Sequence, residues 1–302
     1  MHKTEGTNHA LNLFANGPPG TRVEQNWLNA VQNEIRNVVE GASLTLKTAA
    51  TETGDQLLAA INLLIAQNIQ PGSLVRPVFE WKDADEIYIG GGVYHHAGTT
   101  DQIVYWDSQL TYQFTGLAAT DWIYLYIDDS AVVTLGTNVL TVSEFIDNNT
   151  EPAWDHAKKG WYNGLDRCIM AIYTDGTPDM LEFHHDGGDL FQYGNIEADL
   201  WEQNLGVNWT DVTLTIPKFA TAAQVLFKHQ YVNGDINGNY RTNGDATAGH
   251  PTGQALNNAA ERSWNSFKVL TDTNQKIEVQ TADVNDSLTS AATHGYYFPA
   301  GM

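Results

Sequence analysis

The spacing of apolar residues changes at Pro71 and Gly72, and this change is the strongest limit on what the chain can fold into. Before these residues, apolar positions recur at the spacing of an amphipathic helix. After them, apolar residues come in short runs rich in β-branched and aromatic types, separated by clusters of Gly, Asp, Asn and Thr. Such runs are typical of antiparallel sheets. We therefore predict a mainly β fold with an N-terminal α-helical hairpin, in which an antiparallel β domain precedes a C-terminal, jelly-roll-like β-sandwich.

The predicted domain boundaries follow the same pattern. Runs such as "DWIYLYIDDS" and "AVVTLGTNVLTV" are predicted strands of the first β unit. A second β unit is expected to start near Gly206, because apolar and polar residues alternate strictly in "DVTLTIP" just after it. The stretch 233–258, "NGDINGNYRTNGDATAGHPTGQALNN", holds few apolar residues and is predicted to be a long exposed loop or a set of tight turns. The expected units are a helical attachment segment, a central antiparallel β domain and the sandwich, at residues 1–70, 71–205 and 206–302.

The segment from Thr21 to Glu40 predicts an amphipathic surface helix. Thr21 and Glu24 have the three-residue spacing of a capping box at its start, and Gly41 can end it. A second helix is predicted after Thr53, because Thr53 and Gln56 repeat the capping spacing. The apolar stripe of the first helix consists of Trp27, Leu28, Val31, Ile35, Val38 and Val39, and that of the second of Leu57, Leu58, Ile61, Leu64 and Ile65.

A hairpin of two helices has too small a core to be stable alone. In addition, Leu63 points away from the main stripe of the second helix, so this helix is expected to have two neighbours. We predict that the helical segment forms oligomers; the alternative is that both faces pack on the chain's own β domain. The residues expected at the contact are Trp27, Leu28, Val31, Ile35, Val38, Leu57, Ile61 and Leu64.

Charge and composition exclude several classes of partner. The chain of 302 residues has a formal net charge of −21 spread along its length, which repels nucleic acid and anionic membrane surfaces. No window reaches the roughly 20 apolar residues of a membrane span, and the first residues lack the pattern of an export signal. We therefore expect a soluble protein with no nucleic-acid partner and no membrane insertion. The single cysteine, Cys168, lies in the apolar run "RCIMAIY" and is predicted to be a buried strand residue.

Motifs for catalysis or metal binding are weak in this chain. The pairs His95-His96 and His184-His185 are adjacent residues, which point to opposite faces of a strand and converge on one ion only from a loop or around a three-fold axis. Acidic pairs that a glycosidase needs are expected by chance among 36 acidic residues. The chain holds no GxSxG, HExxH, GxxxxGK[ST] or GxGxxG motif. We predict that it is not an enzyme and has no cofactor or metal.

Exposed aromatic residues are candidates for binding a ligand. A Trp or Tyr side chain offers a flat apolar face that suits the CH face of a sugar ring, and binding residues are common in loop-rich regions. The alternative for each is packing in the core or in an interface. The candidates in the C-terminal third are Tyr231, Tyr240, Trp264, Tyr296 and Tyr297.

The helical region resembles a segment common in tail fibre and tail-associated proteins of bacteriophages. The resemblance covers about Pro18 to Ile65, where "WLNAVQNEI" stands at a fixed spacing from "QLLAAI". Two details depart from the pattern: Gly41-Ala42 replaces the more usual Ala-Gly, and the link after Leu46 is rich in threonine. The stretch 151–176, "EPAWDHAKKGWYNGLDRCIMAIYTDG", also looks like phage structural protein sequence.

This resemblance implies a virion component, usually a homotrimer, made in the host cytoplasm and seated on the tail or baseplate by its N-terminal part. Its C-terminal part would face outward, and its further partners would be other phage tail or baseplate proteins. We predict that the C-terminal β-sandwich either binds a host cell-surface glycan or carries the next tail component. Two alternatives stay open. One is an adaptor, collar or capsid-decorating protein without a receptor role, and the other is a carboxylate-dependent polysaccharide depolymerase.

Overall fold

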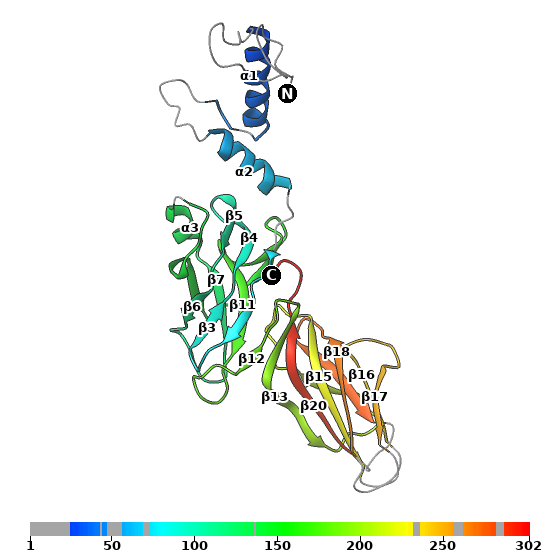
Figure 1. Cartoon of the computed structure of the whole chain (residues 1–302). Helices are drawn as coiled ribbons and strands as arrows, with labels where there is room; N and C mark the ends of the chain where they lie inside the picture. Colours follow the sequence, from blue (N-terminus) through cyan, green and yellow to red (C-terminus); the bar gives the residue numbers. More distant parts are fainter. Residues whose placement is uncertain are drawn as a thin grey trace, which may run out of the picture. The chain divides into compact units, whose positions relative to one another are not determined.

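The chain divides into two compact units, residues 1–70 and 71–302. The computed structural model describes residues 25–42, 44–46, 56–68, 73–135, 137–231, 236–255, 262–281 and 287–302 (Figure 1). The predicted capping pairs at Thr21 and Thr53, the side chains of Leu63 and Ile65, and the turn at Pro71 and Gly72 lie outside the described parts.

The N-terminal unit contains two helices, as predicted: α1 (Gln25–Gly41) and α2 (Gln56–Asn68). Among the described residues their shared core is small: it consists of the buried side chains of Val39, Ala42 and Ala60, with Val38, Leu44 and Leu64 packed against them. Short side chains at the contact bring the helix backbones close together but bury little apolar area. The helical unit therefore has little internal stabilisation of its own.

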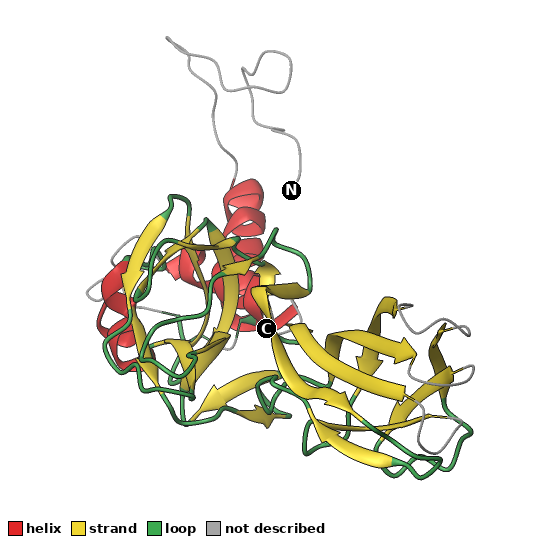
Figure 2. Ribbon diagram, turned by 90° about the horizontal axis from the view of Figure 1, so that it is seen from below, coloured by secondary structure: helices red, strands yellow, loops and turns green. Residues whose placement is uncertain are grey.

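The C-terminal unit is built mainly of strands, which Figure 2 shows in yellow. Its first part contains β1 (Ser73–Val75), β2 (Phe79–Trp81), β3 (Glu86–Ile89), β4 (Gly92–Ala97), β5 (Asp101–Trp106), β6 (Leu110–Gln113), β7 (Trp122–Ile127), β8 (Phe145–Asn148), β9 (Ala153–Asp155), β10 (Gly160–Asn163) and β11 (Asp166–Tyr173). Its second part contains β12 (Phe183–His184), β13 (Leu190–Gln203), β14 (Thr210–Thr213), β15 (Ala222–Tyr231), β16 (Ile236–Thr242), β17 (His250–Ala255), β18 (Arg262–Leu270), β19 (Lys276–Thr281) and β20 (Ser287–Tyr297).

Three antiparallel sheets form the first part, with strand orders β1-β4-β5, β2-β3-β6 and β8-β7-β11-β10-β9. Strands β7 and β11 lie inside the five-stranded sheet and are buried along nearly their whole length. This burial on both faces explains their near-continuous apolar sequences. Cys168 lies in β11 and is fully buried, which confirms its predicted place in a strand.

One predicted strand of the first part is wrong. Residues 131–142 do not form a strand; the structure has helix α3 (Asp129–Leu135) and the short 3-10 helix η1 (Val142–Glu144) instead. The cause is local, because Asp128 Oδ1 accepts the Ser130 N–H at 2.8 Å and so caps the start of α3. Short β-branched runs do not by themselves distinguish a strand from a capped helical turn.

The second part is a β-sandwich with the strand order of a jelly roll (Figure 1). One sheet has the order β12-β13-β20-β15-β18 and the other β14-β19-β16-β17, so that successive strands from β13 to β16 alternate between the sheets. Strands β16 and β17 pack against β15 and β18 of the first sheet. This arrangement confirms the predicted sandwich and its jelly-roll-like connections.

The sandwich begins earlier than the boundary predicted at residue 206. Strand β13 pairs along its length with β20, and β12 adds an edge strand beside it. Strand β13 is hard to recognise in the sequence because its pairing with β20 shifts register at three places. These lie between Gln192 and Glu197, between Glu197 and Leu200, and between Leu200 and Gln203. Each bulge breaks the two-residue alternation by which a strand is recognised.

The prediction of a loop or tight turns for 233–258 is also wrong, because the segment contains strands β16 and β17. Its small residues are required by packing. A Cβ at Gly238 would lie 2.1 Å from His229 Cε1, and Thr252 of β17 is fully buried. Glycine in a strand here marks a close approach between the two sheets.

Candidate functional site

The five-stranded sheet of the sandwich has one face turned away from the core, which we call the outer face. On β15, the side chains of Ala223, Val225, Phe227 and His229 are fully buried, so the alternate residues of this strand lie on the outer face. Strand pairing then places further outer-face residues beside them. The outer face carries Gln192, Trp201, Glu202, Gln224, Lys228, Trp264, Ser266, Lys268 and Tyr297.

Lys228 is at the centre of one aromatic group on the outer face. Its Nζ lies 5.0 Å from the ring centre of Trp201 and 5.5 Å from that of Trp264. It also donates a hydrogen bond to Glu202 Oε1, which lowers the pKa of the Glu202 carboxyl. The Lys228 side chain is only 2% exposed, whereas Trp201 and Trp264 are 41% and 45% exposed. The two indoles thus cover the ammonium group and keep much of their own surface open to solvent.

A second group surrounds Tyr297 on the same face. Lys268 Nζ lies 3.9 Å from the centre of the Tyr297 ring. The Tyr297 hydroxyl donates to Gln224 Oε1 at 2.6 Å, and Gln224 Nε2 donates to Ser266 Oγ at 2.5 Å. These contacts hold the half-buried tyrosine ring in one orientation on the sheet.

The structure separates the five candidate aromatic residues of the sequence. Trp264 and Tyr297 lie on the outer face. Tyr240 is half-buried and stacks on Phe227 at 5.5 Å between ring centres. Tyr296 is fully buried and its hydroxyl donates to the Ala171 carbonyl at 2.7 Å, so it cannot offer a face to a ligand. The side chain of Tyr231 lies outside the described parts.

The sequence did not single out Trp201, Glu202 or Lys228 as site residues. Trp201 and Glu202 lie on the bulged strand β13, where no alternation marks which side chains face outward. Lys228 could have been found, because it alternates with the apolar residues of "VLFKHQY". Trp201 and Glu202 of β13 meet Lys228 of β15 across β20, and this depends on strand pairing, which the local sequence does not specify.

The outer face is suited to a polyhydroxylated ligand. Exposed indole surfaces can pack on the CH face of a sugar ring, and the adjacent Gln, Ser, Lys and Glu side chains can exchange hydrogen bonds with hydroxyl groups. Both features stand on paired strands of one sheet, which place them more rigidly than loops do. The arrangement supports binding rather than a specific bond-making step.

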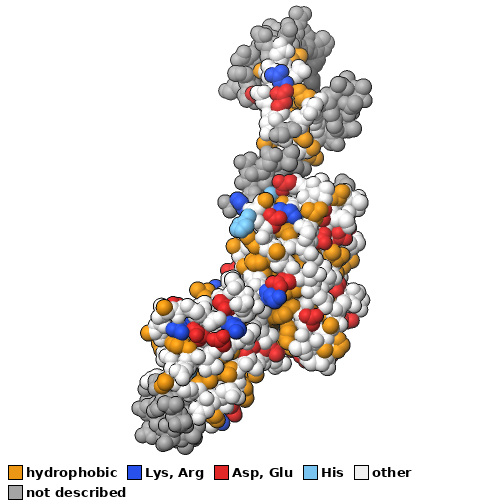
Figure 3. All heavy atoms as spheres, turned by 180° about the vertical axis from the view of Figure 1, so that it is seen from behind, with side chains coloured by type: hydrophobic (Ala, Val, Ile, Leu, Met, Phe, Trp, Pro, Cys, Tyr) orange, Lys and Arg blue, Asp and Glu red, His pale blue; other side chains and the backbone are white. Residues whose placement is uncertain are grey.

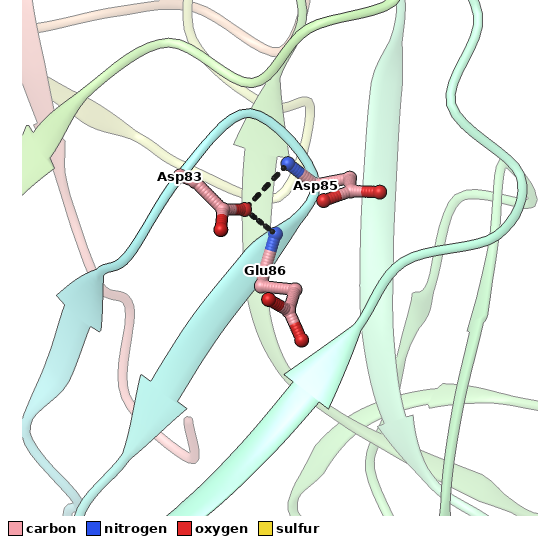
Figure 4. A group of neighbouring side chains, drawn as sticks. All are labelled: Asp83, Asp85 and Glu86. Carbon is pink, nitrogen blue, oxygen red and sulfur yellow. Dashed lines mark hydrogen bonds between the residues drawn. The ribbon is translucent and has the colours of Figure 1, made fainter.

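The cluster of Asp83, Asp85 and Glu86 brings three carboxylates within 4.8 Å of one another (Figure 4). Its bonds are those of a turn: Asp83 Oδ1 accepts the N–H groups of Asp85 and Glu86 at 3.3 and 3.0 Å. Glu86 also accepts a hydrogen bond from Lys82 Nζ at 2.6 Å. These contacts account for the geometry of the cluster without an ion.

The histidine pairs do not converge on a shared site. His95 and His96 of β4 are both buried, and they bond to different carboxylates, Asp101 and Asp129. In the second pair, His184 is exposed and His185 is buried. This agrees with the expectation that adjacent strand residues point to opposite faces.

The predicted contact residues of the helical unit fall into two groups. Val38 and Leu64 pack against its small core, and Trp27 and Val31 are half-buried. The others remain exposed, with exposed fractions of 52% for Leu28, 42% for Ile35, 36% for Leu57 and 41% for Ile61; Leu58, beside them, is 62% exposed. The apolar stripes are thus only partly covered.

Charged side chains on the face of the β unit shown in Figure 3 are scattered, and several basic groups lie next to acidic ones. Lys218 with Glu151 and Arg241 with Glu278 are such pairs in the unit. No helix in the described ranges is long and apolar enough to cross a bilayer.

Comparisons with known proteins give no family. No family model matches the chain, and no curated protein matches it significantly. Among solved structures, it is similar to a Bacillus thuringiensis Cry1Da tryptic core variant with 8% identity, over 75% of this chain and 52% of that chain, at a TM-score of 0.20. For structures of infectious bursal disease virus, Gx strain and Gt strain, the identities are 9% and 12%. These cover 74% and 76% of this chain and 68% of each viral chain, at TM-scores of 0.16 and 0.14. This chain spans about half the length of the Cry1Da chain. Similarity at this level carries no argument about function.

Proposed function

We propose that the chain is a non-enzymatic structural protein of a tailed bacteriophage virion, a tail fibre or baseplate-associated component. The helical unit attaches it to the particle as an oligomer, and the outer face of the sandwich binds a glycan of the host surface. The observation that carries this proposal is the exposed apolar stripe of α1 and α2, with Leu58 at 62% and Leu28 at 52% exposed. The resemblance of residues 18–65 to phage tail proteins adds to it.

The argument from the helices is energetic. Full burial of a leucine side chain stabilises by roughly 1.5–3 kcal/mol, and in the described parts of α1 and α2 five large apolar side chains are exposed. A second and third copy of the same helices around an axis would bury them against one another, as in helical bundles. A trimer is therefore the assembly that we propose, with other tail or baseplate proteins at its end.

The attachment is tested on the virus particle. Antibodies against the chain, viewed by electron microscopy on particles of the phage that carries the gene, are expected to mark the tail or baseplate. Label confined to the capsid would favour a capsid-decorating protein, and the absence of label from the particle would contradict a virion role.

The glycan role is tested with purified protein, host cells and extracted envelope polysaccharide, scoring binding and release of reducing ends separately. Replacing Trp264 by Ala is expected to remove at least about 1.4 kcal/mol of binding free energy. This loss corresponds to binding that is about tenfold weaker. Leu165→Ala is a matched control, because Leu165 is also 45% exposed but lies in the turn between β10 and β11. Binding without cleavage supports the proposal, and cleavage favours a depolymerase. If the protein neither binds nor cleaves the polysaccharide, the result favours an adaptor.

A further inference from the structure

A cavity of about 400 Å³ lies where β2, β12 and β13 meet within the β unit. Its volume falls in the range of small-ligand pockets, about 300–1,000 Å³. Its lining includes apolar residues, among them Trp81, Phe183 and Leu190. It also includes three acidic residues, Glu80, Glu182 and Asp186.

The wall of this cavity is held in place by His185. Its Nδ1 accepts the Phe79 N–H at 3.1 Å, and its Nε2–H donates to the Gly188 carbonyl at 3.0 Å. Because burial lowers the pKa of His185, the ring stays neutral and keeps this tautomer. The ring also packs on Phe298, with 5.3 Å between centres. The cavity is therefore formed before any ligand binds.

The charge of the cavity lining determines whether it favours a cationic or an anionic ligand. Three carboxylates line it, and none of its lining residues is Lys or Arg. Glu80 and Glu182 are exposed, and within the described parts of the chain neither carboxylate accepts a hydrogen bond. Such a cavity repels carboxylates and phosphates and attracts a cation. Its aromatic lining residues favour an organic ligand with an apolar surface over a bare metal ion.

The cavity is continuous with the outer face. His184 of β12 pairs with Gln192 of β13, and Leu190 pairs with Tyr297 of β20. His184, Leu190 and Gln192 line the cavity, while Tyr297 belongs to the outer face. A chain of sugars lying on the outer face can thus place one unit in the cavity.

We propose that this cavity binds an amino sugar with a free ammonium group, a hexosamine unit of a surface glycan. The apolar lining residues receive the CH face of the ring, and Glu80 and Glu182 accept hydrogen bonds from the ammonium group and the hydroxyls. This inference rests on the proposed glycan-binding function and names the class of sugar for it.

The test is isothermal titration calorimetry of the full chain with a glucosamine tetramer, the N-acetylglucosamine tetramer and a galacturonate tetramer at near-neutral pH. The glucosamine tetramer is expected to bind at least about tenfold more tightly than the acetylated one, an effect that added salt weakens. The galacturonate tetramer is expected not to bind. The double variant Glu80→Gln/Glu182→Gln should lose this preference. Asp107→Asn, an exposed carboxylate outside the cavity, should keep it.

Equal binding of the two glucosamine forms, no binding, or an unchanged preference in the double variant would overturn the proposal. The same protein samples are tested on extracted envelope polysaccharide. If the tetramers do not bind as expected but Trp264→Ala still weakens polysaccharide binding, the cavity proposal is wrong and the proposed function stands. If polysaccharide binding also fails, the glycan role itself is wrong.

Discussion

His229 lies between the two sheets of the sandwich and is fully buried. Its Nε2 lies 2.7 Å from Thr252 Oγ1 and its Nδ1 lies 3.2 Å from Thr289 Oγ1, so each ring nitrogen has a hydroxyl partner. The ring fits because Gly238 has no side chain beneath it. A polar group with both bonds made is tolerated in a core, whereas one left unpaired is costly.

Replacing Gly238 by Ala is expected to destabilise the protein. The new Cβ would lie 2.1 Å from His229 Cε1 and 2.5 Å from Thr252 Oγ1, so the ring or the strand must shift. Overpacking of this kind costs typically about 1–3 kcal/mol. The free energy of unfolding, measured in urea, checks the prediction. Gly176→Ala is the control, because nothing lies within 4 Å of its added Cβ, and a control as unstable as Gly238→Ala would contradict the packing argument.

Stability should also depend on the protonation of His229. Burial lowers its pKa from 6.5 to about 4 in the folded chain. Between these pH values the unfolded chain binds a proton that the folded chain does not. The contribution of neutral His229 to the free energy of unfolding is therefore complete above pH 6.5 and is lost as the pH falls toward 4. The whole shift corresponds to about 3 kcal/mol at about 1.36 kcal/mol per pH unit.

The measurement compares unfolding free energies of the protein and of His229→Gln at several pH values. The difference between the two is expected to narrow as the pH is lowered, since the variant lacks the titrating group. Taking the difference cancels the opposite trend of Asp199, whose pKa burial raises to about 6. A difference that stays constant with pH would show that His229 titrates alike in both states.

At the scale of single elements, α3 depends on the residue before it. Asp128 Oδ1 accepts the N–H groups of Ser130 and Ala131 and the hydroxyl of Ser130. Asp128→Ala removes this cap and is expected to cost about 1 kcal/mol of unfolding free energy. Urea unfolding followed by tryptophan fluorescence measures the loss. Asp107→Ala, an exposed aspartate ahead of β6, should leave stability nearly unchanged, and equal losses would argue against capping.

An element can be predicted from the sequence when its own residue pattern determines it, and not when contacts with distant strands do. Strand β19 alternates buried and half-buried residues, and the central strand β11 is apolar from Cys168 to Tyr173, so both were predicted. Strands β16 and β17 were missed because they hold few apolar residues, and because Gly238 and Thr252 are explained only by their contact with His229 on another strand. The bulges of β13 likewise follow from pairing with β20, some 90 residues later.

The same limit applies to the candidate site. Trp264 and Tyr297 were two of five candidate aromatic residues, and composition and position in the chain could not tell them from the candidates that pack in the core. Tyr296 stands next to Tyr297, and a one-residue step on a strand separates a core side chain from an outer one. The cavity beside β12 joins Glu80 to Glu182, whose proximity comes only from the packing of β2 on β12.

At the scale of the whole molecule, the two units differ in how much of their apolar surface they bury. The β unit encloses an extensive buried core that includes residues from both its sandwich and its first part. In the part of the helical unit that the structure describes, three small or medium side chains are buried and larger ones are exposed. We therefore expect the β unit to be stabilised within one chain, and the helices to be stabilised by contacts between chains.

The most direct test of this account is the mass of the full chain in solution, measured by sedimentation equilibrium over a range of concentrations. We predict three times the 33.3 kDa of one chain. Leu28→Gln/Leu58→Gln should shift the mass toward one chain, while Asn37→Ala on the exposed polar side of α1 should not. A mass of 33.3 kDa at every concentration, or a trimer unaffected by the double variant, would contradict the claim that these helices join copies of the chain.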